Sequence, residues 1–247
     1  MTMNGNDPSA HPTGGESLDF IATTNYYLYD NNTRAEVPES WQWFLHPNLD
    51  VYYFNLGMRL LSTDDIRDPN IRALIINIRN EYYEELADDR DFKRLPIDWV
   101  MTITDCNLEN RTAVVGIHSR TAGRSYEWTE NGLVDKPKEQ FWTFIAEYPA
   151  HDKSIPPALE NQFVHALTNA QEKTKEGRIF PLDGSQIETV ARQYNYLKAG
   201  QSSGKQNAVA CIAWLMGAVM PLDELPNGST DGRISNERIR ALTRVHI

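Results

Sequence analysis

The sequence predicts an α+β protein: an N-terminal three-stranded antiparallel sheet, a long helix, a second β-meander and a helical C-terminal region. Two clusters of short β-branched and aromatic runs, at residues 37–62 and 98–131, are bounded by turn residues, as strands are. Between and after these clusters, apolar residues recur at helical spacing. The chain has 247 residues, 40% of them hydrophobic and 23% charged, a composition that can bury a core and excludes wholesale disorder.

The N-terminal part divides into two segments. Residues 1–17 are rich in Gly, Pro, Ser, Thr and Asn, and we predict a disordered leader there. Residues 18–66 are predicted to form a β module. Its central strand is the β-branched and aromatic run at 51–54, flanked by turns at 46–50 and 55–57.

The segment 67–136 is predicted to hold the long helix and the second β-meander. Asp68 is a suitable N-cap, and Pro69 fits the first helical position because the N–H of that position has no partner within the helix. Helical spacing continues to Leu86, so we expect the helix to end near Ala87. The strands of the meander are predicted at residues 99–104, 113–117 and 125–129.

The segment 137–247 is predicted to be a helical domain. Asp183 can cap one of its helices and Gly200 can end it. The most apolar stretch, residues 208–220, is shorter than the ~20 residues that a membrane-spanning helix needs, so we predict a buried helix there. Further helices are expected at residues 141–148, 159–170 and 234–247.

The region 37–63 carries a recognisable motif. Pro38 precedes Trp41, the aromatic pair Tyr52 and Tyr53 follows, and Asn55 comes after the pair. At these spacings the region resembles a WW domain. The resemblance implies a structural buckle of Pro38, Trp41, Tyr53 and Asn55, because strand alternation puts Tyr53 on the face where it can stack with Trp41 and Pro38.

The opposite face of the WW-like sheet is where that family binds proline-rich peptides. Tyr52 and Phe54 point to this face by strand alternation. The second tryptophan of the family falls at Thr63 and its histidine at Leu56, so only Tyr52 remains of the aromatic clamp. We therefore expect an incomplete peptide groove formed by Tyr52, Phe54, Leu56 and Thr63.

A wider resemblance covers more of the chain. The stretch 62–65, followed by Asp68, Pro69 and a long helix, is similar to a group of uncharacterised mushroom-type fungal proteins. That resemblance implies a degenerate WW-like segment, a second β segment and helical regions.

Other motifs have simpler interpretations. The D-D-x-x-D run at 64–68 resembles the magnesium and diphosphate motif of terpene synthases, but it adjoins Pro69 and is better explained as a helix cap. The segment 200–206 resembles a phosphate loop that lacks its first glycine and its Ser or Thr. The six histidines, Cys106 and Cys211 have no metal-binding or catalytic spacing. We predict no enzyme, no metal and no cofactor.

Charge and cysteine content constrain the partners and the compartment. Acidic residues number 34 against 24 basic ones, giving a formal net charge of −10, which argues against nucleic acid as a partner. The two cysteines form no disulfide framework, and residues 1–17 have neither the basic nor the apolar region of a secretory signal. We expect a cytoplasmic protein.

These observations together predict a non-enzymatic protein–protein interaction or scaffold protein. Its partner is a protein or peptide, and the WW resemblance implies a proline-rich one. The alternatives are a structural domain whose WW-like sheet is covered by its own helices, a membrane-associated protein, and an enzyme of unrecognised type. The exposure of Tyr52 and Phe54 separates the first two interpretations. The oligomeric state stays open.

Overall fold

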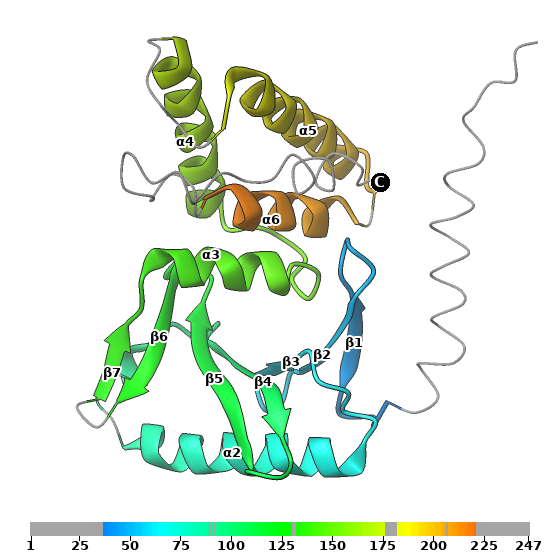
Figure 1. Ribbon diagram of the computed structural model, residues 1–247, viewed down its shortest axis with the longest axis vertical. Helices are drawn as coiled ribbons and strands as arrows, with labels where there is room; N and C mark the ends of the chain where they lie inside the picture. Colours follow the sequence, from blue (N-terminus) through cyan, green and yellow to red (C-terminus); the bar gives the residue numbers. More distant parts are fainter. Residues whose placement is uncertain are drawn as a thin grey trace, which may run out of the picture. The chain divides into compact units, whose positions relative to one another are not determined.

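One seven-stranded sheet dominates the described part of the chain, with helices on both of its faces (Figure 1). A computed structural model describes residues 37–88, 90, 92–129, 132–175, 182–205 and 207–220. These residues all belong to one compact unit. The predicted leader at 1–17 and the predicted tail helix at 234–247 lie outside the described residues.

The strands follow one another across the sheet in sequence order. They are β1 Gln42–Leu45, β2 Val51–Asn55, β3 Leu60–Ser62, β4 Val100–Asn107, β5 Thr112–Ser119, β6 Arg124–Thr129 and β7 Gly132–Asp135. Neighbours are antiparallel except β3 and β4, which are parallel and place Leu60 opposite Met101. The N-terminal antiparallel start is confirmed. The prediction of two separate β segments is corrected, because the β3–β4 pairing joins them, and β7 was not predicted.

Helix α2, Pro69–Ala87, connects the two parallel strands. Its N-cap and first position are as predicted: the Asp68 carboxylate accepts a hydrogen bond of 2.7 Å from the backbone N–H of Asn70, and Pro69 follows. The short 3₁₀ helix η2, Phe92–Arg94, leads into β4. Leu74, Ile75, Ile78 and Leu86 are buried against the sheet.

The sheet is apolar on both faces, because successive side chains of a strand point to opposite sides. Tyr53 and Leu60 belong to the cluster beneath α2, whereas Tyr52, Phe54 and Leu61 belong to the cluster on the other face. Two-sided burial of this kind explains the unbroken apolar and aromatic runs in β2 and β3.

Four helices follow the sheet: α3 Lys138–Glu147, α4 Pro157–Lys175, α5 Gly184–Ser202 and α6 Ala208–Val219. Helix α3 lies on the sheet, and α6, α5 and α4 form further layers above it (Figure 1). Asp183 caps α5 in a capping box with Gln186, as predicted, but α5 continues past the buried Gly200 to Ser202. Within the described ranges no helix, α6 included, is long and apolar enough to cross a membrane.

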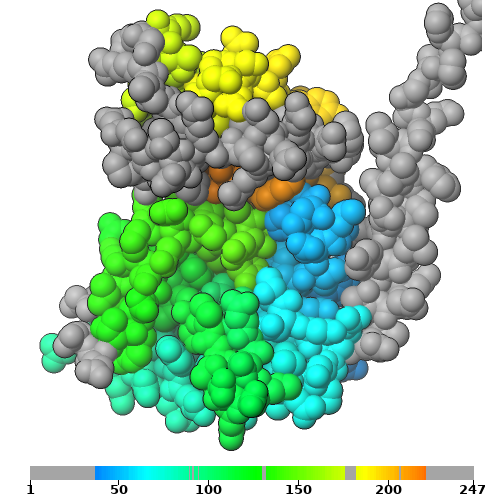
Figure 2. All heavy atoms as spheres, in the orientation of Figure 1, coloured from blue at the N-terminus to red at the C-terminus, as the bar shows by residue number. Residues whose placement is uncertain are grey.

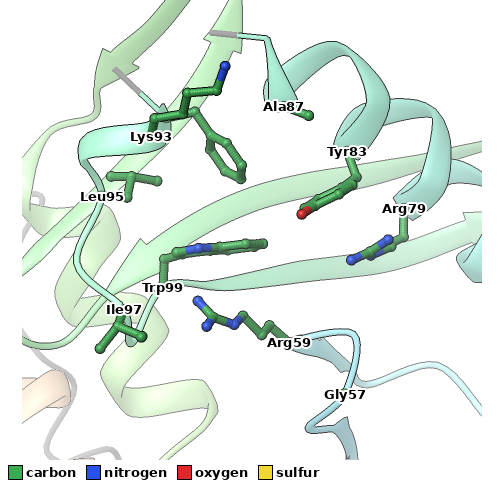
Figure 3. A pocket seen from close by; sticks show the side chains of 10 residues that line it. Gly57, Arg59, Arg79, Tyr83, Ala87, Lys93, Leu95, Ile97 and Trp99 are labelled. Atoms are coloured by element: carbon green, nitrogen blue, oxygen red, sulfur yellow. The ribbon is translucent and has the colours of Figure 1, made fainter. Parts of the chain in front are cut away.

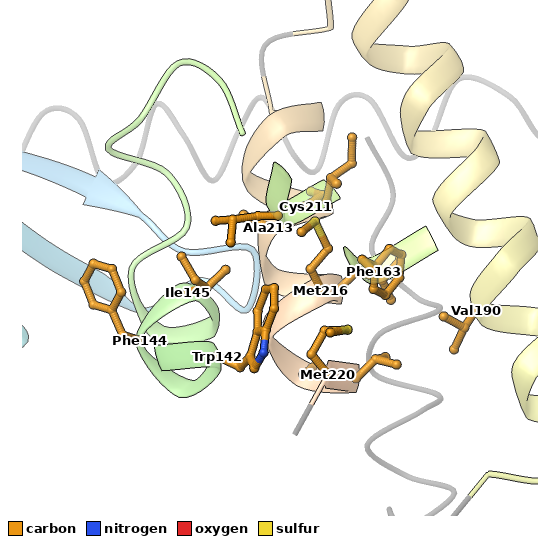
Figure 4. Packing of buried hydrophobic residues seen from close by; sticks show 14 of the residues in the cluster. Trp142, Phe144, Ile145, Phe163, Val190, Cys211, Ala213, Met216 and Met220 are labelled. Carbon is orange, nitrogen blue, oxygen red and sulfur yellow. The ribbon is translucent and has the colours of Figure 1, made fainter. Parts of the chain in front are cut away.

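Helices α3 and α6 pack so closely that their backbones come into contact. Figure 4 shows Trp142 and Ile145 reaching from α3 toward Met216 of α6. The backbones approach at Gly217, where an added Cβ would lie 2.4 Å from the backbone N of Ala146 and 2.5 Å from the carbonyl oxygen of Trp142. Only glycine fits there.

We expect Gly217→Ala to lower the free energy of unfolding by about 1–3 kcal/mol, because the methyl group would push two packed backbones apart. Urea unfolding measures this. The matched control is Gly184→Ala at the start of α5, where the new Cβ would meet only the Thr174 methyl at 3.2 Å. Equal stability of the two variants would contradict the close contact.

Candidate functional site

The face of β2 that was expected to be free is covered by the chain itself. Tyr52 is 1% exposed and Phe54 is 9% exposed. The Tyr52 hydroxyl accepts a 2.7 Å hydrogen bond from the backbone N–H of Ala150 and lies 3.3 Å from Nδ1 of His151. The expected peptide groove is therefore corrected: Tyr52 and Phe54 are inaccessible to a peptide, as the structural alternative predicts.

The other two predicted groove residues are exposed, but they lie in different parts of the structure. Leu56 is 67% exposed in the turn after β2. Thr63 is exposed after β3 and lines a hollow of about 370 Å³ together with Tyr52 and Trp214 of α6. In Figure 2 the atoms of the β1–β2 segment (blue) lie next to those of α6 (orange), where this hollow is formed.

The predicted stacking of Trp41 on Tyr53 is corrected: no ring contact joins these two described residues, although the four buckle residues lie in structural positions. Trp41 and Tyr53 are buried in the cluster under α2. The Trp41 backbone N–H donates to the carbonyl of Pro38 at 2.8 Å. The Asn55 side chain accepts a 3.0 Å hydrogen bond from the backbone N–H of Met58 and so fixes the turn between β2 and β3.

The acidic run at 64–68 is used for local structure. Asp65 forms an ion pair of 2.7 Å with Arg67, and Asp68 caps α2. Asp64 accepts a 3.2 Å hydrogen bond from the backbone N–H of Cys106. Burial and the Asp64 carboxylate raise the pKa of the Cys106 thiol to about 12, so it is a poor nucleophile at neutral pH. Among the described residues, no group of three His, Cys, Asp or Glu side chains could hold a metal ion.

A buried polar cluster lies between the sheet and α3, centred on His118. Its Nδ1 lies 2.6 Å from the Ser125 hydroxyl and its Nε2 lies 3.0 Å from the Thr102 hydroxyl. The imidazole stacks on Phe144 with 4.1 Å between ring centres and 2° between ring planes. Both nitrogens and one face of the ring are thus occupied.

A second buried cluster joins the sheet to the segment after α3. The Tyr52 hydroxyl contacts His151 Nδ1 at 3.3 Å and also accepts a hydrogen bond from the backbone N–H of Ala150. Arg120, which is 6% exposed, forms a 2.7 Å ion pair with Asp152 and donates to the carbonyl of Tyr148. Ser125, His118 and Arg120 line neither the hollow of about 370 Å³ nor the one of about 500 Å³, whereas Tyr52 of the second cluster lines the former.

These buried histidines make stability depend on pH. Burial lowers the pKa of His118 to about 3, and burial together with Arg120 lowers the pKa of His151 well below its usual value. In the unfolded chain both histidines take up protons below about pH 6.5, whereas in the folded chain they do not. Their contribution is therefore complete above that pH and is lost as the pH falls.

We expect the free energy of unfolding to fall between about pH 7 and about pH 5, with His118 alone accounting for about 2 kcal/mol. Urea unfolding at the two pH values measures this. The difference shrinks in His118→Gln and persists in the control His165→Gln, whose side chain is exposed on α4. A His118 ring that titrates near its ordinary pKa in NMR would contradict the argument.

A second hollow, of about 500 Å³, opens on the α2 side of the sheet (Figure 3). We call it the basic hollow and define it by Arg59, Arg79, Tyr83, Lys93 and Trp99. Three parts of the chain meet there: the β2–β3 turn, one face of α2, and the segment from η2 to the start of β4.

Aromatic rings hold the two guanidinium groups of the basic hollow. The Cζ of Arg79 lies 4.2 Å from the ring centre of Tyr83, and the Cζ of Arg59 lies 5.1 Å from that of Trp99. Tyr83 and Trp99 are themselves stacked, with 6.4 Å between ring centres and 23° between planes. Stacking fixes a guanidinium by its face and leaves N–H groups at its edge for oxygen atoms of a ligand, although Arg79 already donates one N–H to the Asn80 side chain at 3.1 Å.

The cations of the basic hollow have no acidic partner in the described part of the chain. Neither Arg59, Arg79 nor Lys93 lies within ion-pair distance of a carboxylate there. Five basic side chains elsewhere in the described ranges pair with acids, namely Arg67, Arg120, Arg124, Lys136 and Lys198, whereas others, such as Arg111, do not. The Nε of Arg79 is buried without a hydrogen-bond partner. This hollow is suited to an anionic ligand.

Sequence reasoning missed the basic hollow. The only local signal is the spacing of Arg79 and Tyr83, which puts them next to each other on one helix face. Arg59 has a left-handed backbone with φ +53°, which is uncommon for a residue other than glycine and directs its side chain toward Trp99. No pattern links Arg59 to Trp99 across the intervening helix.

Comparisons of this chain with protein-family models, with curated proteins and with solved structures find no match.

Proposed function

We propose that this chain is a non-enzymatic protein-interaction protein, and that its basic hollow binds an acidic segment of a partner protein. The observation that carries the proposal is a group of three cations, Arg59, Arg79 and Lys93, that have no acidic partner among the described residues and surround two stacked aromatic rings. The net charge of the chain is −10, so these three cations give the hollow a local charge opposite in sign to that of the protein as a whole.

Apolar groups beside the basic hollow favour a peptide over a simple anion. Ile97 lines the hollow and is 86% exposed, and Leu56, which precedes the lining residue Gly57, is 67% exposed. Arginine and aromatic residues are enriched where proteins contact one another. A partner segment with acidic side chains and one or two apolar ones matches both features.

A structural role for the WW-like sheet is compatible with this proposal. The burial of Tyr52 and Phe54 favours the interpretation that this face of the sheet is covered by the chain's own helices. Recognition then takes place on the α2 side, and a proline-rich ligand is not required. Of the four residues predicted to form the peptide groove, only Leu56 directly precedes a residue that lines the basic hollow, Gly57.

The test is fluorescence anisotropy with an array of short labelled peptides that combine Asp and Glu with one aromatic or aliphatic residue. We expect acidic peptides to bind and their Asn and Gln counterparts not to bind. Arg59→Ala and Arg79→Ala should each weaken binding by about tenfold, and added salt should weaken it further.

Arg111→Ala is the matched control. Arg111 is exposed in a turn and has the same left-handed φ of +53° as Arg59, but it does not line the basic hollow. Its replacement should leave peptide binding unchanged. The proposal is wrong if no acidic peptide binds the folded protein, or if Arg111→Ala weakens binding as much as Arg59→Ala.

A further inference from the structure

The hollow beside Tyr52 has the opposite character to the basic hollow. We call it the acidic hollow and define it by Asp50, Asp105, Glu147, Tyr148 and Trp214. It has a volume of about 370 Å³, and no lysine or arginine is among the residues that line it. The β1–β2 turn, the end of β4, the end of α3 and the middle of α6 contribute to it.

The histidine that lines the acidic hollow is neutral. The Nε2 of His46 lies 2.7 Å from the carbonyl oxygen of Ala146, which can only accept a hydrogen bond, so Nε2 carries the proton. The Nδ1 of His46 accepts a 3.0 Å hydrogen bond from the backbone N–H of Asn48. Both ring nitrogens are thereby assigned, and His46 adds no positive charge.

Two of the carboxylates of the acidic hollow have no partner among the described residues. Asp105 and Glu147 form no hydrogen bond and no ion pair there, whereas Asp50 accepts a 2.7 Å hydrogen bond from the side chain of Asn48. Desolvation and the negative charge of Asp105 raise the pKa of Glu147. The acidic hollow therefore concentrates negative charge, and no lysine or arginine in its lining balances that charge.

The wall of the acidic hollow holds a polar atom without a regular hydrogen bond. Tyr148 is 1% exposed, and its buried hydroxyl interacts with the Thr63 side chain, which also lines the hollow, but makes no hydrogen bond of regular geometry. A ligand carrying N–H groups can supply the regular hydrogen bond that this hydroxyl lacks. Trp214, which packs edge to face with His46 at 5.3 Å, adds an indole, the ring that attracts cations most strongly.

The backbone places Asp105 in the acidic hollow at a cost. Its φ is +55°, in the left-handed region, and the register of β4 against β5 shifts between Thr104 and Asn107. Such bulges re-aim side chains and recur beside binding sites. An aspartate tolerates this conformation better than a branched or bulky residue.

We infer that the acidic hollow binds an organic cation, a compound or side chain that carries a guanidinium or primary ammonium group. A metal ion requires several ligands close together, and no such group of side chains is found among the described residues. A guanidinium group presents several N–H donors, so it can reach separated carboxylates while its face packs on Trp214. The inference is independent of the basic hollow.

The test uses two probes of one chemistry: agmatine as a free guanidinium compound, and a blocked Gly-Arg-Gly peptide as a guanidinium on a chain. The same peptide with citrulline in place of arginine is the neutral control, and sodium chloride is the ionic-strength control. Binding is followed through the indole N–H signal of Trp214 in ¹⁵N NMR spectra, assigned with Trp214→Phe.

We expect a saturable shift with either guanidinium probe and none with the citrulline peptide or sodium chloride. Glu147→Gln and Asp105→Asn should each weaken binding by about tenfold. Asparagine is tolerated at a left-handed position, so Asp105→Asn removes the charge and keeps the backbone. Tighter binding of agmatine identifies a small free cation as the ligand, and tighter binding of the peptide identifies a side chain of a partner; both outcomes support the inference.

Glu109→Gln is the matched control, because Glu109 is exposed in the β4–β5 turn and does not line the acidic hollow. It should bind like the unmodified chain. The inference is overturned if neither guanidinium probe gives a saturable shift, if the citrulline peptide binds equally well, or if Glu109→Gln weakens binding as much as Glu147→Gln. Circular dichroism confirms that each variant is folded.

Discussion

Burial of the sheet on both faces is the constraint on which the rest of this fold depends. Tyr52 and Tyr53 are neighbours in β2, yet one packs toward α3 and the other toward α2, and neither is more than 3% exposed. A sheet with two apolar faces needs a helical layer on each side. Helix α2 supplies one layer while connecting the parallel strands β3 and β4, and α3 supplies the other.

Local chemistry made much of the fold predictable. The Asp68–Pro69 start of α2 and the Asp183 cap of α5 depend on residues next to each other in the chain, and the sequence is enough to find them. The parallel pairing of Leu60 with Met101 depends on contacts across a whole helix, for which the sequence carries no local signal. The unbroken apolar run in β2 is itself a signal of two-sided burial, whereas the WW resemblance implies one exposed face.

The two hollows were less predictable than the strands and helices that form them. Arg59 and Trp99 meet because β3 and β4 are adjacent, and Asp105 and Glu147 meet because α3 lies over the end of β4. Every one of these side chains would be solvated and unremarkable on an isolated strand or helix. The two hollows form only when these side chains come together from different strands and helices. They can therefore be predicted only after the order of the strands is known.

The net charge of the chain is a poor guide to what each hollow binds. Trp99 lies just before β4 and Asp105 near its end, so the rise of a strand puts them about 20 Å apart. That separation exceeds the screening length of about 8 Å at physiological ionic strength, and the charges of the two hollows barely influence each other. Groups this far apart also contribute independently to binding. A chain with a net charge of −10 can therefore carry one hollow lined by cations and another lined by carboxylates, each with a local charge set by its own side chains.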